Sequence, residues 1–337
     1  MPNRRWITQL VTANLNRRKK MPISILSLPG THDSCTANLS TLVEWTIQRT
    51  AKCQDRSLRD QFNNGIRYFD IRVRVEGQHL YIVHDGPVGA MDCYCYYDDP
   101  QNGSRIMELN DVIEAFIDRL DIRNPANQHY DFVIMSIKVA NSSIGYENVL
   151  ADYLRQKQIN NYCFCPTNTP VITVEAAAKK IVLLNRVSAI RNDIAGFSID
   201  ASEWGKNGNT GLVTTDIMKL NVMVQDEYNI TNVQTKIDTY NKMNRNAKDG
   251  FAGILILNHL SCTNVYNVVH PTTIFNVKEM ADQVNQEFIN TYANNIKDIR
   301  GVTVMDFPGN NQINMIIQSN NGSQFVCFGQ YTLYIRN

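Results

Sequence analysis

The sequence of 337 residues has no long hydrophobic run and almost no net charge. No apolar stretch approaches the roughly 20 residues that span a bilayer, and the N-terminal segment "MPNRRWITQLVTANLNRRKK" lacks the apolar centre of a secretory signal. We therefore expect a chain that is cytosolic, exported by an unusual route, or seen after removal of a signal. Its 33 basic and 32 acidic side chains provide no long-range field to gather an anionic polymer, so we expect no nucleic-acid partner.

Zinc-binding patterns and internal repeats are also missing. The eight cysteines include two Cys-x-Cys pairs but no Cys-x₂-Cys unit of the kind found in structural zinc sites. An even cysteine count permits disulfides without giving their pairing. No repeat or low-complexity linker divides the chain, and single α/β barrels reach this length. We expect one catalytic domain over residues 1–337, with a core at about 21–307 and a C-terminal extension at 308–337.

Short apolar, β-branched segments recur along the chain and predict strands that are buried on both faces. Helical patterns separate most of these segments, as in βα units. The expected strands are 23–28, 66–73, 80–84, 131–138, 180–186, 221–226, 253–258 and 301–306. The expected helices are 108–120, 146–159, 232–247 and 276–296.

Eight strands favour a closed α/β barrel of the TIM type, a (β/α)8 barrel, over an open sheet. The barrel is expected to be imperfect at one place. Only "RVEGQH" (74–79) separates the second and third strands, which is too short for a crossover helix. We therefore predict an extended return at this point in place of a helix.

Nearly every expected strand ends in a polar residue. The active site of an α/β barrel lies at the C-terminal ends of its strands, so these side chains should converge. They are His32, Arg72, His84, Lys138, Arg186, Asp226, the pair Asn258-His259, and Asp306. A strand can also end simply where polarity begins, but His, Arg, Lys and Asp at eight ends favour a shared site.

Two pairs among these residues suggest proton and phosphate chemistry. His32 could act as a base, with Asp306 as its partner, because the last strand neighbours the first in a closed barrel. Asp70 and Arg72 are two residues apart on a strand and point to the same face. Arg72 then offers a planar fork for a phosphate oxygen, held by Asp70, although such a pair can also be purely structural.

Two cations, a carboxylate and a phenol, namely Lys138, Arg186, Asp226 and Tyr228, complete the rim. Such a set suits a small polyol, because charged groups bind hydroxyls and an aromatic ring stacks on a sugar-like ring. Together with a histidine base and an arginine, they indicate a phosphodiester that carries a neighbouring hydroxyl.

The chain resembles the bacterial phosphatidylinositol-specific phospholipases C, whose fold is an imperfect α/β barrel. The segments "SLPGTHDS", "RYFDIR", "HDGPV", "IMSIK", "KIVLLNR", "VQDEY" and "VMDF" have the order and approximate spacing of that family. The resemblance covers roughly residues 6–307, while 314–337 matches nothing known. It implies attack of the inositol 2-hydroxyl on its own phosphorus, which releases diacylglycerol and a cyclic inositol phosphate.

The resemblance also implies roles for individual residues. His32 corresponds to the general base with Asp306 as its partner, Arg72 to the group that stabilises charge on the phosphate, and Asp33 to the partner of a second histidine, the general acid. The inositol-binding positions correspond to Lys138, Arg186, Asp226 and Tyr228. Trp204 falls in a mobile-looking loop, "DASEWGKNGNTG", that could cover the site.

The family comparison implies no metal and no other cofactor. Eukaryotic relatives hold calcium with acidic residues and an asparagine where this chain has Arg72 and Asp33, and an arginine would replace and repel that cation. In "LSTLVEWTI" (39–47), Leu42 and Trp45 are candidates to enter a lipid headgroup region, or else they pack on the barrel.

The implied partner is phosphatidylinositol or a glycosyl-phosphatidylinositol anchor, met by a monomer in transient contact with a membrane surface. The resemblance favours a secreted or peripheral membrane protein, while the lack of a visible signal keeps a cytoplasmic location open.

Two positions depart from the bacterial pattern. Cys35 replaces the glycine that usually follows "THDS". Histidine usually stands immediately before the glycine of "HDG", in the slot of Asp85, whereas here His84 comes one residue earlier. A strict strand register would turn His84 away from the phosphate, and a one-residue bulge would turn it back. His84 is then the acid; otherwise Asp85 is the acid with a raised pKa, or the chain is weakened or inactive.

Two other functions compete with this reading. One is a different barrel phosphodiesterase, such as a relative of the glycerophosphodiesterases or of sphingomyelinase D, which normally need a metal-binding carboxylate cluster. The other is a non-catalytic inositol-phosphate or membrane-binding module that has kept the rim and lost the acid.

Overall fold

The computed structural model describes residues 3–39, 49–84, 92–99, 103–140, 143, 145–158, 163–204, 211–212, 219–230, 232–247, 253–263, 276–321, 323–328 and 331–336. Within these ranges no helix combines the length and the hydropathy that a membrane-spanning segment needs.

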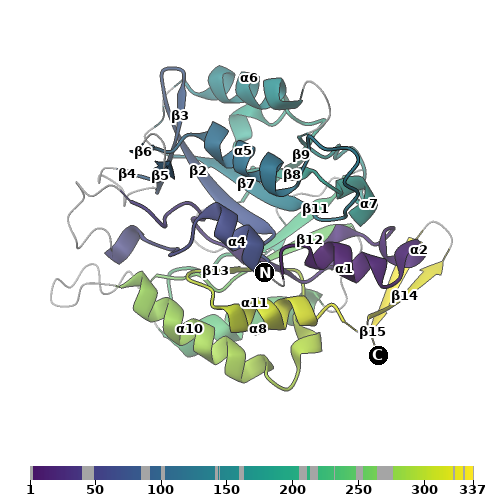
Figure 1. Cartoon of the computed structure of the whole chain (residues 1–337). Helices are drawn as coiled ribbons and strands as arrows, with labels where there is room; N and C mark the ends of the chain where they lie inside the picture. Colours follow the sequence, from purple (N-terminus) through teal and green to yellow (C-terminus); the bar gives the residue numbers. More distant parts are fainter. Residues whose placement is uncertain are drawn as a thin grey trace.

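The centre of the molecule is a nearly closed barrel of eight parallel strands (Figure 1). Neighbouring strands around the ring are β11 (Asn221–Gln225), β12 (Ile254–His259), β13 (Val302–Met305), β1 (Leu28–Thr31), β2 (Tyr68–Glu76), β7 (Val133–Val139), β8 (Ile181–Asn185) and β9 (Ser198–Asp200). The predicted fold class, an imperfect (β/α)8 barrel, is therefore confirmed.

The ring differs from the prediction in the bounds of its first strand and in the identity of one other strand. The first strand begins at Leu28, because Ile23–Ile25 forms a short 3-10 helix that the apolar pattern does not reveal. The expected third barrel strand is β3 (His79–His84), which runs antiparallel to β2 and lies outside the ring. The three-residue strand β9, which carries no apolar run, takes the place left in the ring.

The predicted extended return between the second and third expected strands is confirmed: a tight hairpin joins β2 and β3, with no crossover helix between them. Val73 of β2 pairs with Val139 of β7 on one edge and with Ile82 of β3 on the other. The start of β2 pairs on that second edge with β1, through Tyr68 and Phe69. β3 therefore occupies the edge of β2 just beyond the point where β1 ends, and it runs toward the loop that follows β1.

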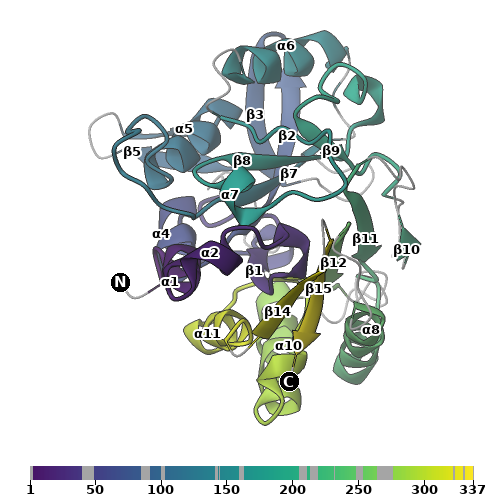
Figure 2. The ribbon, with the colours of Figure 1, turned by 90° about the vertical axis from the view of Figure 1, so that its right-hand side faces the viewer.

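The helices cover the outside of the barrel on two sides (Figures 1 and 2). One side carries α4 (Leu58–Asn64), α5 (Leu109–Arg119) and α6 (Glu147–Gln158); the other carries α8 (Val233–Asn246), α10 (Val277–Tyr292) and α11 (Asn310–Gln318). The four predicted helices are thus present as α5, α6, α8 and α10. Local sequence sets their starts: Glu108 and Asp111 form a capping box on α5, and Asn232 caps α8 by accepting from the backbone N–H of Thr235.

The remaining elements are short or lie at the ends of the chain. They are α1 (Trp6–Thr12), α2 (Leu15–Arg18), β4 (Cys93–Tyr94), β5 (Tyr96–Asp99), β6 (Gly103–Ile106), α7 (Val174–Ala177), η2 (Ser188–Ile190), β10 (Gly211–Leu212), η4 (Ile296–Asp298), β14 (Ser323–Phe328) and β15 (Tyr331–Arg336). Trp6 and Ile7 of α1 belong to the same apolar cluster as Leu28 and Val302, at the starts of two barrel strands. α1 therefore covers the N-terminal end of the barrel.

Residues alternate between the barrel interior and the outer helices, as strand geometry requires. In β7, Ile134 packs in the interior cluster, whereas Val133 and Met135 pack against the helices. Gly30 faces Tyr68 across the β1–β2 pair, and a Cβ on Gly30 would come within 2.9 Å of the Tyr68 side chain. The glycine of "SLPG" is thus required by the close approach of these strands.

A fully buried ion pair fixes the start of β2 to α1 and to the segment before β7. The Arg67 guanidinium donates to Asp131 Oδ1 at 2.6 Å, and both side chains are completely buried. Asp131 Oδ2 also accepts from the Thr8 hydroxyl at 2.5 Å.

We expect Asp131→Ala to lower the free energy of unfolding by about 3–5 kcal/mol, because it leaves the Arg67 charge buried without a partner. Removing one partner of the exposed pair Lys19–Glu175 by Glu175→Ala should cost less than about 1 kcal/mol. Urea unfolding followed by circular dichroism measures both. Equal losses in the two variants would contradict the importance of the buried pair.

Candidate active site

Seven strands place a polar side chain at the last interior position before or just after the strand ends. In four of them the residue two positions earlier, Leu184, Val224, Leu257 or Val304, belongs to the interior apolar cluster, so strand alternation directs the polar side chain into the C-terminal end of the barrel. They are His32, Arg72, Lys138, Arg186, Asp226, His259 and Asp306. The predicted convergence of the strand ends is therefore present in the structure.

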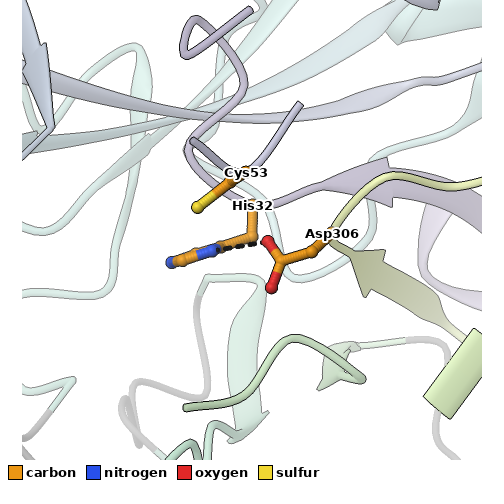
Figure 3. Close-up of side chains that lie close together, drawn as sticks. All are labelled: His32, Cys53 and Asp306. Carbon is orange, nitrogen blue, oxygen red and sulfur yellow. Dashed lines mark hydrogen bonds and ion pairs between the residues drawn. The ribbon is translucent and has the colours of Figure 1, made fainter. Parts of the chain in front are cut away.

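His32 and Asp306 meet because they extend neighbouring strands. Thr31 of β1 pairs with Met305 of β13, and the next residue on each strand contributes to the pair. His32 Nδ1 lies 2.9 Å from Asp306 Oδ1 (Figure 3). Buried Gln54 holds the two loops together, since its amide donates to the carbonyls of His32 at 2.8 Å and Met305 at 3.0 Å.

The second nitrogen of His32 faces an arginine. Arg72 Nη2 lies 2.6 Å from His32 Nε2. A guanidinium can only donate, so Nε2 accepts and Nδ1 carries the hydrogen that is donated to Asp306. This contact assigns the neutral ring, with a lone pair on Nε2.

The charges around His32 favour the protonated ring. Burial lowers its pKa, but the carboxylates of Asp33 and Asp306 more than offset this effect and raise the pKa to about 9. The contact with Arg72 and the raised pKa indicate opposite charge states. The resting ring is neutral, since two N–H groups cannot face each other at 2.6 Å. The raised pKa then describes how readily the ring accepts a proton once Arg72 turns to another acceptor.

Arg72 links this pair to two further carboxylates. Its Nε lies 2.6 Å from Asp33 Oδ1, and its Nη2 lies 3.5 Å from Asp70 Oδ2. Arg186 approaches the other oxygen of Asp70 at 3.4 Å. Burial alone would raise the pKa of Asp70, but the two guanidinium groups hold it below its ordinary value. Asp70 thus stays ionised and anchors both arginines.

His84 lies beside Asp33, with its Nε2 3.3 Å from Asp33 Oδ2. The one-residue bulge expected after this histidine falls at Asp85, outside the described residues. The β2–β3 pairs run without interruption from Glu76↔His79 to Val73↔Ile82. Val83 and His84 pair instead with Tyr94 and Cys93 of β4, so the end of β3 no longer follows the register of β2. His84 can therefore reach the loop after β1, whereas Asp85 lies outside the described residues.

The backbone after both strands of the His32–Asp306 pair is strained. Asp33 and Phe307, which directly follow His32 and Asp306, have φ values of 40° and 44°. Non-glycine residues seldom adopt such left-handed conformations, which concentrate at functional sites. These turns direct Asp33 back toward His84 and Arg72.

Trp204, Arg186 and Asp226 form a second group at the same end of the barrel. The Arg186 guanidinium lies 3.7 Å from the centre of the Trp204 ring, and Trp204 Nε1 donates to Asp226 Oδ2 at 3.1 Å. Trp204 is only 7% exposed. It was expected in a loop that covers the site, and its side chain is found within the site, while residues 205–210 of that loop lie outside the described ranges.

His259 is a buried member of this group that the sequence showed only as a polar strand end. Its Nδ1 lies 3.1 Å from Ser261 Oγ and 3.5 Å from Asp226 Oδ1. Its ring is edge-on to Trp204, with ring centres 5.4 Å apart. Burial lowers the pKa of His259 to about 4, although the Asp226 carboxylate opposes the shift. The ring is therefore neutral at neutral pH.

The lowered pKa of His259 makes stability depend on pH in a defined direction. The unfolded chain protonates this histidine near pH 6.5 and the folded chain near pH 4, so folding loses free energy as the pH falls between these values. We expect acidification across this window to destabilise wild type by about 3 kcal/mol more than His259→Gln. Urea unfolding at the two ends of the window tests this, and identical pH profiles of the two proteins would contradict it.

The remaining predicted site residues are located by their positions along the strands and loops. Lys138 of β7 pairs in register with Arg72, and Tyr228 follows Asp226 by two residues in the loop after β11. Leu42 and Trp45, the candidates for membrane contact, lie outside the described residues. Cys35, in place of the usual glycine, is buried in the outer apolar cluster, and it leaves His32 and Asp33 at the site.

Three groups of possible metal ligands occur among the described residues, and all include a member of the His32, Asp33 or Asp306 set. In the group of His32, Asp33 and Asp70, the Arg72 guanidinium contacts all three side chains. A permanent cation at this position repels a hard divalent ion, so the residues do not fit a calcium site.

The chain is similar to characterised bacterial enzymes over most of its length, although no family model matches it. It is 27% identical over 310 residues to 1-phosphatidylinositol phosphodiesterase of Listeria monocytogenes, which covers 88% of this chain and 81% of that protein. The protein of the same name from Staphylococcus aureus is 25% identical over 290 residues, which covers 84% of each.

The fold comparison agrees with the sequence comparison. A variant of phosphatidylinositol-specific phospholipase C from Staphylococcus aureus superposes with a TM-score of 0.74, covering 94% of this chain and 98% of that one at 20% identity. At this identity the superposition supports the fold alone. In sequence and in fold, and over most of its length, this chain is thus similar to the bacterial phosphatidylinositol-specific phospholipases C.

Proposed function

We propose that this chain is a metal-independent phospholipase C that cleaves phosphatidylinositol, or a glycosyl-phosphatidylinositol anchor, by attack of the inositol 2-hydroxyl. The observation that carries the proposal is the contact chain from Asp306 through His32 to Arg72, with N···O and N···N distances of 2.9 and 2.6 Å. It places a histidine lone pair next to a guanidinium that can bind a phosphate. The names of the relatives support the same substrate.

In the proposed first step, His32 Nε2 takes the proton of the 2-hydroxyl as its oxygen bonds to phosphorus. A substrate phosphate draws Arg72 away from Nε2, which frees the lone pair, and the guanidinium then faces the charge that develops on the phosphate oxygens. Asp306 keeps the Nδ1–H in place and stabilises the imidazolium. The raised pKa of His32 favours this transfer.

In the proposed second part, the bond from phosphorus to the glycerol oxygen breaks. His84, held by Asp33 at 3.3 Å, gives its Nε2 proton to that oxygen, so that diacylglycerol leaves and inositol 1,2-cyclic phosphate remains. No metal or other cofactor enters these steps, since Arg72 supplies the positive charge.

The headgroup is proposed to bind at the second group of side chains. Asp226 would accept from inositol hydroxyls, the cations Lys138 and Arg186 would donate, and Tyr228 would stack on the ring. Asp70 orients Arg72 and Arg186, and Trp204 lines the same space. We also propose Asp85, which follows His84, as a candidate for headgroup contact. The site would open toward a membrane surface that Leu42 and Trp45 contact transiently, with the chain acting as a monomer.

Phosphorus NMR of the products tests the proposal directly. We expect phosphatidylinositol, incubated with the protein in EDTA, to give inositol 1,2-cyclic phosphate. Product that forms only after a divalent metal is added would favour a metal-dependent phosphodiesterase. Inositol-phosphate binding without turnover would favour a non-catalytic binding module. Either result would overturn the proposed function.

Two variants assign the general acid. We expect His84→Ala to lower kcat/KM for phosphatidylinositol by about 10²- to 10⁴-fold, and Asp85→Ala to have a smaller effect. A substrate with a good leaving group should restore most of the activity of His84→Ala, because its leaving oxygen needs no proton. Selective loss in the Asp85 variant, rescued by the same substrate, would instead make Asp85 the acid.

A further inference from the structure

Cys53 is a buried thiol beside the His32–Asp306 pair that the proposed mechanism does not use. It precedes α4 in the chain. Its backbone carbonyl accepts from the Phe307 N–H at 2.9 Å, and its own N–H donates to Thr36 Oγ1 at 2.9 Å. These bonds join the loops after β1 and β13. The side chain is 2% exposed.

The Cys53 sulfur converges with two other metal-binding side chains (Figure 3). The ligand atoms of His32, Cys53 and Asp306 lie within 4.8 Å of one another. Imidazole nitrogen, thiolate sulfur and carboxylate oxygen are the set that zinc prefers, with bond lengths near 2.0–2.3 Å. In a tetrahedral site such bonds place the ligand atoms about 3.5 Å apart, so small side-chain rotations suffice to close the set around an ion.

The same thiol also lies within 4.8 Å of Asp33 and His84, which form a second possible group. That group is less suited to an ion because Asp33 Oδ1 is held by Arg72 at 2.6 Å. Asp306, in contrast, contacts His32 and Cys53, the two side chains that would share the ion, and its carboxylate has no arginine contact among the described residues. The group of His32, Cys53 and Asp306 is therefore the better site.

The charge balance favours a divalent ion over none once the thiol ionises. Burial and the carboxylates of Asp306 and Asp33 raise the pKa of the Cys53 thiol, so the thiol ionises only as a cation binds. The Cys53 thiolate and the Asp306 carboxylate together then balance the charge of a divalent cation. His32 is 21% exposed on its side chain and provides the path from solvent.

We propose that His32, Cys53 and Asp306 form an inhibitory site for a thiophilic divalent cation of the zinc class. The ion bonds to His32 Nδ1, to the Cys53 sulfur and to an Asp306 oxygen, and the thiol proton leaves to solvent. The hydrogen of the imidazole moves to Nε2, and Arg72 turns from that nitrogen toward Asp33 and Asp70. The ring then has no lone pair that could take a hydroxyl proton, and Asp306 no longer accepts a hydrogen bond from His32 Nδ1. Binding needs only these residues, whereas inhibition rests on the proposed function.

Cobalt absorption tests the site without turnover. Co²⁺ added to the full-length protein is expected to give a thiolate-to-cobalt charge-transfer band, which Cys53→Ser and Cys53→Ala lose. Cys163→Ser, a change at another buried cysteine outside the three groups, should keep the band. Circular dichroism establishes that each variant is folded. Absence of the band in wild type, or its persistence in both folded Cys53 variants, would overturn the proposal.

Activity measurements then test the inhibition. Zn²⁺, but not Ca²⁺ or Mg²⁺, is expected to inhibit phosphatidylinositol cleavage, with full recovery in EDTA. Cys53→Ser should raise the Zn²⁺ concentration for half-inhibition at least about tenfold, since even outer-shell changes cost 10- to 100-fold in metal affinity. An inactive protein with the cobalt band would refute the proposed function and leave the site intact. An active protein that binds cobalt through Cys53 but ignores Zn²⁺ would refute the inhibitory role.

Discussion

His32→Ala is expected to lower kcat/KM for phosphatidylinositol by about 10⁴-fold, at the upper end of what a general base contributes. The alanine removes the lone pair that faces Arg72 and the ring that Asp306 holds at 2.9 Å. The variant also removes the imidazole that lies beside the buried carboxylates of Asp33 and Asp306, which raise its pKa in wild type. His259 is the neighbouring imidazole, with its ring centre 6.3 Å from that of His32, but its Nδ1 is directed to Asp226 and Ser261 instead of Asp306.

Two comparisons make this expectation specific. His79→Ala removes an exposed histidine, paired with Glu108, from the start of β3 and should change kcat/KM less than about twofold. Asp306→Asn keeps the shape of the pair but cannot stabilise an imidazolium, so it should fall between wild type and His32→Ala. Cleavage of labelled vesicles at fixed lipid concentration measures all three. A loss of less than tenfold in folded His32→Ala would mean that another group takes the proton.

Arg72→Lys is expected to lower kcat/KM by about 10²- to 10³-fold, the usual effect of removing one donor that faces a developing oxyanion. The guanidinium reaches Asp33 through Nε and reaches Asp70 and His32 through Nη2. A lysine has one nitrogen and cannot span these partners. The loss should appear mainly in kcat, because the charge on the phosphate grows in the transition state.

The matched control for this variant is Arg74→Lys. Arg74 lies two residues further along β2 and is also paired with two carboxylates, Glu76 at 2.6 Å and Asp92 at 3.2 Å. Among the described residues, Arg74 pairs with Glu76 and Asp92 and not with the groups around His32. Its replacement should therefore leave kcat/KM within a few-fold of wild type. Equal losses in the two variants would point to a general effect of arginine on this strand. Activity of Arg72→Lys close to that of wild type would remove Arg72 from the mechanism.

The barrel and most of the site followed from two regularities of the sequence. Short apolar, β-branched runs predicted strands that are buried on both faces, and the polar residue that follows each run predicted the end of the barrel at which the candidate site lies. Strand adjacency placed Asp306 beside His32 although 274 positions separate them. These predictions succeeded because interior position and chain direction are fixed by local geometry.

The features that escaped prediction lack a local pattern. β9 is three residues long, and the first strand contains Pro29 and Gly30, which usually signal a turn. The antiparallel pairing of β3 depends on its partner, and an apolar run has the same appearance in either direction. Cys53 and Gln54 stand in an irregular segment, and only the return of the chain past β1 and β13 brings them to the site.

The hairpin position of β3 has a consequence for how such a site can diverge. A ring strand cannot shift by one residue without reversing its interior and exterior faces along its whole length. β3 is joined to the ring along one edge only, and its last two residues pair with β4 instead of β2. A one-residue change at its end is therefore absorbed locally, while His32, Arg72 and Asp306 keep their places. The side chain that faces Asp33 from β3 can therefore change its position along the chain without loss of the barrel.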